Sequence, residues 1–220
     1  MEGCILELMK TIMATLLLSC LAAGSAALPL KVYSPVPFLC QAPYANWDQP
    51  WQDACEEAAI IMAIHYIRGG PVDREAGNRE ILDLVDFQSR KYGGHFDLTA
   101  AQAARLIKDY YEFEKLEIKY DITIDDVKEE LARGNLVIAP MAGRLLGNPY
   151  YTPPGPAYHY MLFKGYDDRT KEFITNDCGT KRGRSYRYQY SAAYAAIHDW
   201  TGSKKTIAQG GKAIIVIKLK

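Results

Sequence analysis

The spacing of apolar residues changes once along this chain, and that change limits the folds open to it. Up to Gly134 the apolar positions recur at helical spacing, and from Asn135 onward they form alternating or continuous runs. The helical half predicts four helices, in the segments 53–67, 73–92, 100–113 and 123–134. The second half predicts five strands, in "NLVIAPM", "YHYMLFKGY", "KEFITND", "SYRYQY" and "KAIIVIKLK".

The order of these elements predicts the fold class. Helices come first and an antiparallel sheet second, which is typical of an α+β domain built from two packed parts. A short strand, "KLEIKY", precedes the fourth helix, and a helical insert, "SAAYAAIHDW", precedes the last strand. The segment Ala142–Ala157 is rich in proline and glycine, so we expect a long surface loop there.

The N-terminal 27 residues read as a secretory signal rather than as part of the fold, which leaves 28–220 as a single domain. Lys10 is followed by twenty uncharged residues that end in a run of small side chains. A translation start at Met9 explains the acidic residues that precede it. An uncleaved anchor and lipid attachment at Cys20 are the alternatives. Each interpretation predicts a bacterial protein that is secreted or held in the cell envelope, with membrane contact through this segment alone.

The charge and composition of the chain limit the classes of partner that it can bind. Lys and Arg together number 26, as do Asp and Glu, so the formal net charge is zero. The chain lacks the basic field that nucleic-acid binding requires, and a peptide or protein is the expected partner. The histidines show no helical ligand spacing, so we expect neither a metal site nor any other cofactor.

Cysteine usage points to one reactive thiol. Removal of the signal leaves Cys40, Cys55 and Cys178, an odd number in an oxidising compartment. Pairing of Cys40 with Cys178 would leave Cys55 free, although the sequence does not establish a bridge. Cys55 lies at the start of a predicted helix, where the helix dipole lowers thiol pKa values, so we expect a depressed pKa there. The alternative is an inert buried cysteine.

One of the four histidines is placed to act as a base for such a thiol. His65 lies about 15 Å further along the same helix as Cys55 and cannot reach it. His95 and His198 fall in a turn and near a helix end, where solvent exposure explains them. His159 opens an apolar strand directly after the long loop, which favours the edge of a cleft, although a half-buried strand histidine is the alternative.

A catalytic imidazole also needs an oxygen that orients it. The negatively charged oxygen that forms on the substrate during attack, the oxyanion, needs a hydrogen-bond donor. The strand after that of His159 ends in Asn176 and Asp177, and a hairpin would return this end to His159. Adjacent strand residues point to opposite faces, so the two side chains cannot easily meet one imidazole. Asp177 is the partner if the face that it shares with Phe173 turns toward His159, and a carboxylate stabilises an imidazolium better than an amide does, so Asp177 is the predicted partner. Gln41 precedes Cys55 by fourteen residues and offers a side-chain amide to the oxyanion; an ordinary surface glutamine is the alternative.

The order glutamine, cysteine, histidine, then asparagine or aspartate is that of papain-like cysteine peptidases. The blocks "VPFLCQAPYANWDQPWQDACEEAAIIMAIHY", "LARGNLVIAP", "AYHYMLFKGYDD" and "FITNDCGT" resemble the bacterial family thirty-nine-like cysteine peptidase domain, which is related to bacteriocin-leader processing peptidases. The resemblance implies a papain-like fold, with Cys55 as nucleophile, His159 as base and acid, Asp177 as its partner and Gln41 as oxyanion donor. This chain has Cys55-Glu56 where the family often has Cys-Gly, and Asp-Cys-Gly at 177–179 where it usually has Asp-Pro-Gly.

The expected function is therefore that of an exported cysteine peptidase. We expect Tyr150 and Tyr151, in the loop ahead of His159, to contact the substrate, because aromatic side chains offer contact area at low entropic cost. Two alternatives share the same residues: an amidase acting on cell-wall peptides, and a peptide-binding module that has lost turnover.

Overall fold

The computed structural model describes residues 27–219, so the predicted signal, its start at Met9 and its alternatives at Cys20 lie outside the described residues. The helices follow the predicted order: α2 (Cys55–Arg68), α3 (Arg74–Tyr92), α4 (Ala100–Tyr111), α5 (Ile124–Ala132) and α6 (Tyr190–Ala196), with short 3₁₀ turns η1 (Trp51–Asp53), η2 (Gly143–Leu146) and η3 (Ile207–Gln209). The strands are β1 (Lys31–Tyr33), β2 (Leu116–Tyr120), β3 (Leu136–Met141), β4 (His159–Asp167), β5 (Glu172–Asn176), β6 (Tyr186–Gln189) and β7 (Ala213–Ile217).

The helix boundaries follow from local capping chemistry. Asp73 caps α3 by accepting a hydrogen bond from a backbone N–H of its first turn, and Thr99 and Thr123 form capping boxes at α4 and α5. Gly69 ends α2 with a φ of 73°, a left-handed conformation that glycine adopts without steric cost. These positions confirm the predicted starts and ends to within two residues.

All strand pairs of the sheet are antiparallel, in the order β2-β7-β3-β4-β5-β6, with β1 paired to β4. The hairpin between β4 and β5 turns where the sequence predicts it, directly after Asp167. The sequence analysis did not predict β1, which is only three residues long and has no buried alternation. It joins the sheet through backbone pairing, with Lys31 opposite Asp167.

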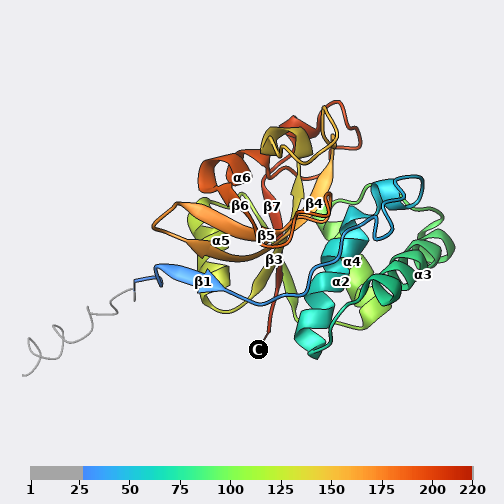
Figure 1. The fold of residues 1–220 in the computed structure, drawn as a ribbon, viewed down its shortest axis with the longest axis horizontal. Helices are drawn as coiled ribbons and strands as arrows, with labels where there is room; N and C mark the ends of the chain where they lie inside the picture. The colour runs from blue at the N-terminus through green and yellow to red at the C-terminus, as the bar shows by residue number, and fades with distance from the viewer. Residues whose placement is uncertain (1–26, 220) are drawn as a thin grey trace, which may run out of the picture.

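The sheet separates two hydrophobic cores, and period-two alternation assigns residues to them. On β3, Leu136 and Ile138 pack in the core shared with α2, α3 and α4, whereas Val137 and Ala139 pack in the core beneath α5 and α6. Figure 1 shows the first three helices gathered on one side of the sheet and α5 and α6 on the other. The fold is therefore α+β, as predicted, with α2 packed directly on β4.

The long loop contains more regular structure than its composition suggests. The turn η2 occupies its first residues, and Leu146 is buried in the core beneath α6. Among residues 27–219, no helix combines the length and apolar character that crossing a bilayer requires.

Candidate active site

Cys55 is the first residue of α2, directly after the turn η1. The helix is buried from this position through Ile64, and the Cys55 side chain is itself only 5% exposed. A residue in the first turn of a helix has a backbone N–H without an intrahelical acceptor, so this N–H is available to a ligand. The Sγ atom donates a hydrogen bond to Glu56 Oε2 at 3.0 Å.

The prediction that the pKa of Cys55 is depressed is wrong. Burial, and after it the carboxyl group of Glu56, raise the pKa of the Cys55 thiol well above its usual value. The dipole of α2 acts in the opposite direction but is outweighed because the sulfur is removed from water beside an acidic side chain. Cys55 is therefore a neutral thiol until its proton is taken by a base.

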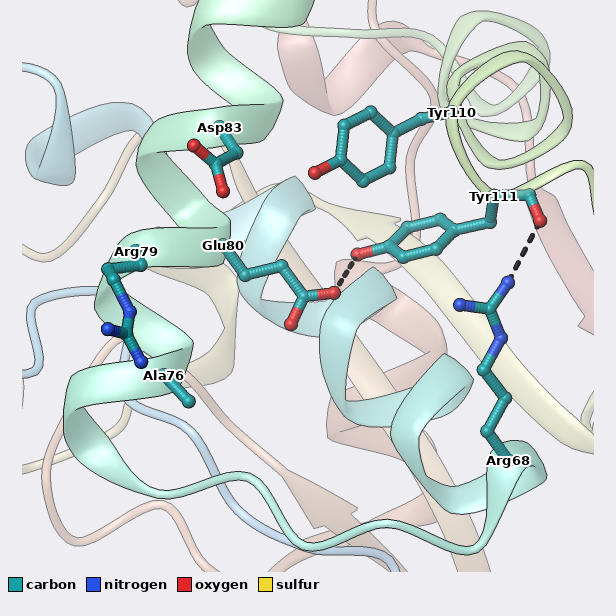
Figure 2. A pocket seen from close by; sticks show the side chains of 7 residues that line it. All are labelled: Arg68, Ala76, Arg79, Glu80, Asp83, Tyr110 and Tyr111. Carbon is teal, nitrogen blue, oxygen red and sulfur yellow. Dashed lines mark hydrogen bonds between the residues drawn. The ribbon is translucent and has the colours of Figure 1, made fainter.

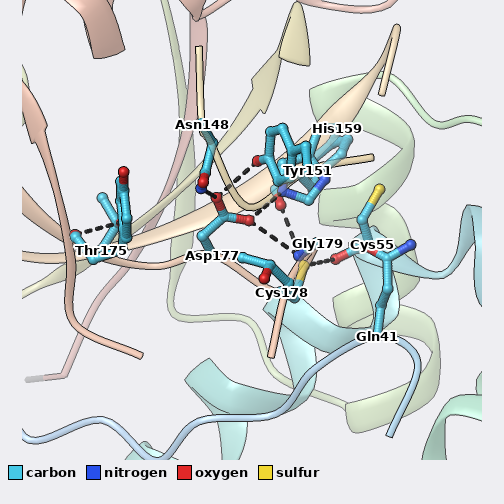
Figure 3. Close-up of polar contacts among 12 residues, drawn as sticks. Gln41, Cys55, Asn148, Tyr151, His159, Thr175, Asp177, Cys178 and Gly179 are labelled. Carbon is cyan, nitrogen blue, oxygen red and sulfur yellow. Dashed lines mark hydrogen bonds and ion pairs between the residues drawn. The ribbon is translucent and has the colours of Figure 1, made fainter. Parts of the chain in front are cut away.

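His159 begins β4, and its imidazole is paired with a carboxylate. His159 Nε2 lies 2.9 Å from Asp177 Oδ1, and both side chains are almost fully buried. Because Nε2 is engaged by Asp177, Nδ1 is the ring nitrogen that remains for another proton transfer. Figure 3 shows His159 and Asp177 on one side of the site, with Cys55 on the facing helix.

Asp177 is the centre of a hydrogen-bonded shell that the sequence analysis did not find. Its Oδ2 accepts hydrogen bonds from Asn148 Nδ2 at 2.9 Å, Tyr151 OH at 2.7 Å and Tyr188 OH at 2.6 Å. Its Oδ1 accepts from the backbone N–H of Gly179 at 3.0 Å. Burial acts to raise the pKa of Asp177, but the charge and hydrogen bond of His159, together with the hydrogen bonds from the two tyrosines, bring that pKa below its usual value. The group is thus held as a carboxylate.

Asn176 has a different environment from its neighbour. Its side-chain amide donates to the backbone carbonyls of Val36 and Pro37, at 3.3 and 2.9 Å, and accepts from the N–H of Ser185 at 3.1 Å. These contacts join the N-terminal segment to the β5–β6 connection. Of the two candidates, the structure pairs Asp177 with His159.

Cys178 connects the helix that bears Cys55 to the strand that bears His159. Its Sγ lies 3.5 Å from the carbonyl oxygen of Cys55 and 3.4 Å from that of Tyr160, the residue after His159. Helix α2, which carries Cys55, and strand β4, which carries His159, are therefore both in contact with one buried sulfur. Cys40, Cys55 and Cys178 are all free thiols in the structure, so no Cys40–Cys178 bridge is formed.

Gln41 is buried beside the turn that precedes Cys55, but its amide is engaged. Nε2 lies 3.0 Å from the carbonyl oxygens of both Trp51 and Gln52, whereas Oε1 has no hydrogen-bond partner among the described residues. An amide has two hydrogens, so one of these contacts must open before Gln41 can donate to an oxyanion. Figure 3 shows the Gln41 amide on the Cys55 side of the site.

The adjacent tyrosines of the long loop differ in their surroundings. Tyr150 is 45% exposed, with its ring edge-on to Tyr186 and under the guanidinium of Arg182. Tyr151 lies edge-on to the His159 ring, and its hydroxyl is committed to Asp177, whose charge, after burial, raises the pKa of the phenol. Tyr150 remains a candidate substrate contact, whereas Tyr151 belongs to the shell around Asp177.

A polar hollow of about 500 Å³ lies elsewhere, among α2, α3 and α4 (Figure 2). It includes Arg68, which lies about 20 Å along α2 from Cys55. Within it, Glu80 accepts a hydrogen bond from Tyr111 OH at 2.6 Å and lies 2.7 Å from His65 Nε2, so its carboxylate is engaged by local partners. This hollow contains no nucleophile. Within residues 27–219, no cluster of three His, Cys, Asp or Glu side chains is arranged to hold a metal ion.

The arrangement of helices on an antiparallel sheet, with a cysteine at a helix start, defines a papain-like α+β fold. A putative C39-like peptidase from Bacillus anthracis shares this fold, with a TM-score of 0.53 and 16% identity over 86% of this chain and 98% of that one. Xylellain, a cysteine protease from Xylella fastidiosa, gives a TM-score of 0.45 and 17% identity over 88% and 87% of the two chains. No curated protein matches the sequence.

Residues 34–207 match the Peptidase_C39 like family, and this chain belongs to that family. The matched range includes Cys55, His159 and Asp177 and most of both cores. The family is one of cysteine peptidases, so its reaction class is hydrolysis by a cysteine nucleophile.

Proposed function

We propose that this protein is an exported cysteine peptidase that cuts peptide bonds with Cys55 as nucleophile and His159 as base and acid. The observation that carries the proposal is the buried His159–Asp177 pair at 2.9 Å, in which His159 begins β4, the strand that packs on the helix that begins at Cys55. Export is proposed from the uncharged N-terminal segment of the sequence alone.

The proposed reaction uses the atoms of the site that are free to transfer a proton or to donate a hydrogen bond to the substrate. His159 takes the Sγ proton, and the resulting thiolate attacks the carbonyl carbon of the scissile bond while the imidazolium is stabilised by Asp177. The Cys55 backbone N–H and a released Gln41 N–H donate to the oxyanion. The imidazolium then protonates the leaving amine, and water, deprotonated by His159, hydrolyses the thioester and frees Cys55.

Substrate digestion tests the proposed function. Purified protein and its Cys55→Ala variant are incubated with a denatured protein mixture and, separately, with cell-wall muropeptides, and new termini are identified by mass spectrometry. We expect wild-type protein alone to generate new termini in the protein mixture. Cleavage confined to muropeptides would replace the peptidase with an amidase, and cleavage of neither, in a protein that still binds peptides, would indicate a binding module.

Asp177→Ala should lower kcat at least about tenfold, because the imidazole then loses its orienting carboxylate and the charge that stabilises the imidazolium. The matched control is Asn176→Ala, the adjacent residue, which contacts backbone groups only. It should lower the thermal unfolding temperature and leave kcat within about threefold of wild type. The opposite ranking of kcat in folded variants would contradict the assignment of Asp177.

Tyr150→Ala should raise KM more than it lowers kcat, because the exposed ring lies in the loop ahead of His159 and offers contact area to a bound peptide. Tyr151→Phe should act in the reverse manner, since the lost hydroxyl is a donor to Asp177. Steady-state kinetics on one peptide substrate separate the two effects. Equal losses in kcat and kcat/KM for Tyr150→Ala would instead indicate contacts made only in the transition state.

A further inference from the structure

Glu56 directly follows the candidate nucleophile, and its carboxyl group is in contact with the sulfur. Cys55 Sγ donates to Glu56 Oε2 at 3.0 Å, and the Glu56 side chain is 1% exposed. An acidic residue in the first turn of a helix usually faces water while it complements the helix dipole. A carboxyl group buried against a thiol is a costly arrangement, and it therefore needs a specific explanation.

The fold holds this carboxyl group in place from the side opposite the sulfur. Glu56 Oε1 accepts a hydrogen bond from the backbone N–H of Leu98 at 3.1 Å. The carbonyl of Leu98 in turn accepts hydrogen bonds from Tyr158 OH at 2.5 Å and Tyr160 OH at 3.1 Å, the two residues that flank His159. Glu56 is therefore fixed between the thiol and a backbone group that is tied to the His159 strand.

We propose that Glu56 is a further catalytic residue: its protonated carboxyl donates a hydrogen bond to the Cys55 thiolate, and its ionised carboxylate keeps Cys55 as a resting neutral thiol. This inference rests on the proposed role of Cys55 as nucleophile. In the active form the Sγ proton has moved to His159, and the Glu56 O–H points at the sulfur anion. In the resting form the sulfur keeps its proton and donates it to the carboxylate.

Electrostatics separates the two forms. A thiolate and a carboxylate in contact at 3.0 Å are like charges in a site removed from water, so each strongly disfavours ionisation of the other. A neutral carboxylic acid in the same position is a donor to an anion, which is a charge-assisted and strong hydrogen bond. Ionisation of Glu56 therefore switches the same contact from supporting the thiolate to opposing it.

The surroundings of Glu56 set the pH at which this occurs. Burial, and after it the neighbouring Glu57, raise the pKa of Glu56 to about 8. The titratable groups that face Glu56 from the packed elements are Cys55 and Glu57 on α2, His95 in the α3–α4 loop, Tyr158 and Tyr160 at β4, and Cys178 after β5. Burial holds the pKa values of both tyrosines above their usual value, so they stay neutral in this range. Below about pH 8 Glu56 is mainly protonated and the site is active; above it the resting form prevails.

The test measures the alkylation rate of Cys55 against pH in Glu56→Gln, with the modified residue identified by peptide mapping. The variant is isosteric, and the Leu98 N–H fixes the new amide oxygen on its own side, which places the amide donor at the sulfur. At about pH 9 only about a tenth of Glu56 remains protonated in the wild type, so the variant should react about tenfold faster there. At about pH 6 the two rates should agree within about threefold.

Glu57→Gln is the matched control, because the adjacent side chain is equally buried but acts on the sulfur through its charge alone, without contact. Loss of its charge lowers the pKa of Glu56, so the fall in the Cys55 alkylation rate at high pH should begin at lower pH than in the wild type, whereas Glu56→Gln should remove this fall. This variant keeps the Glu56 carboxyl group and remains informative if Glu56→Gln does not fold.

The role of Glu56 would be overturned if the folded Glu56→Gln variant kept the wild-type fall in alkylation at high pH, or if it alkylated more slowly at every pH. A fall that begins at higher pH in Glu57→Gln than in the wild type would also overturn it. Alkylation is measured without a peptide substrate. If peptide hydrolysis is absent while the fall in alkylation disappears in Glu56→Gln and begins at lower pH in Glu57→Gln, the proposed peptidase fails and the coupling of Glu56 to Cys55 stands.

Discussion

His159→Ala should lower kcat/KM at least about 10⁴-fold while the protein remains folded, because no other group in the proposed reaction transfers protons to and from the thiol. The effect is expected to be large because burial raises the pKa of the Cys55 thiol, so a base is needed to remove its proton. Asp177 keeps its donors from Asn148, Tyr188 and Gly179 in the variant, which protects the shell. Peptidase kinetics and thermal unfolding, measured on the same preparation, check both parts.

His95→Ala is the matched control for that experiment. His95 Nε2 lies 3.3 Å from Glu57 in the first turn of α2, so it is a second imidazole near the nucleophile. It has no contact with Asp177 and no place in the proposed proton path. The His95→Ala substitution should lower kcat/KM less than about tenfold. A greater loss for His95→Ala than for His159→Ala would indicate that His95, in the α3–α4 loop, is the base.

Gln41→Ala should lower kcat about 10²- to 10³-fold, equivalent to about 2.7–4 kcal/mol of barrier, if the amide supplies an oxyanion donor. The structure adds a second consequence, because the carbonyl groups of Trp51 and Gln52 lose their shared donor. Alkylation of Cys55 separates the two effects: oxyanion stabilisation leaves the alkylation rate unchanged, whereas a displaced turn changes it together with kcat. Turnover equal to that of wild type would make Gln41 a structural residue only.

The elements of the fold were predictable because their signals are local. Capping residues such as Asp73 and Thr99 define helix starts, and alternation along β3 assigns its residues to the two cores. The choice of Asp177 over Asn176 also depends on alternation, since adjacent strand residues face opposite sides. The β4–β5 hairpin then brings the end of β5 back to His159.

The electrostatics of the site were not predictable, because they depend on tertiary burial. A cysteine at a helix start suggests a lowered pKa, but the sequence does not show that Glu56 is turned inward by the backbone N–H of Leu98, 42 residues away. The role of Tyr151 is hidden for the same reason: its loop position suggests exposure, and only the fold places its hydroxyl on Asp177. In the sequence, Glu56 is visible only as a departure from the Cys-Gly that the family often has.

The central claim is that Cys55, made nucleophilic by His159, is the reacting group. The most direct test is to treat the wild type and His159→Ala with a peptidyl epoxide at about pH 7 and to map the modified cysteine by mass spectrometry. Cys40 is more exposed than Cys55, so reaction governed by exposure alone would modify Cys40 first. We expect modification of Cys55 in the wild type and its loss in His159→Ala. Preferential modification of Cys40 or Cys178, or labelling of Cys55 that does not depend on His159, would contradict the account.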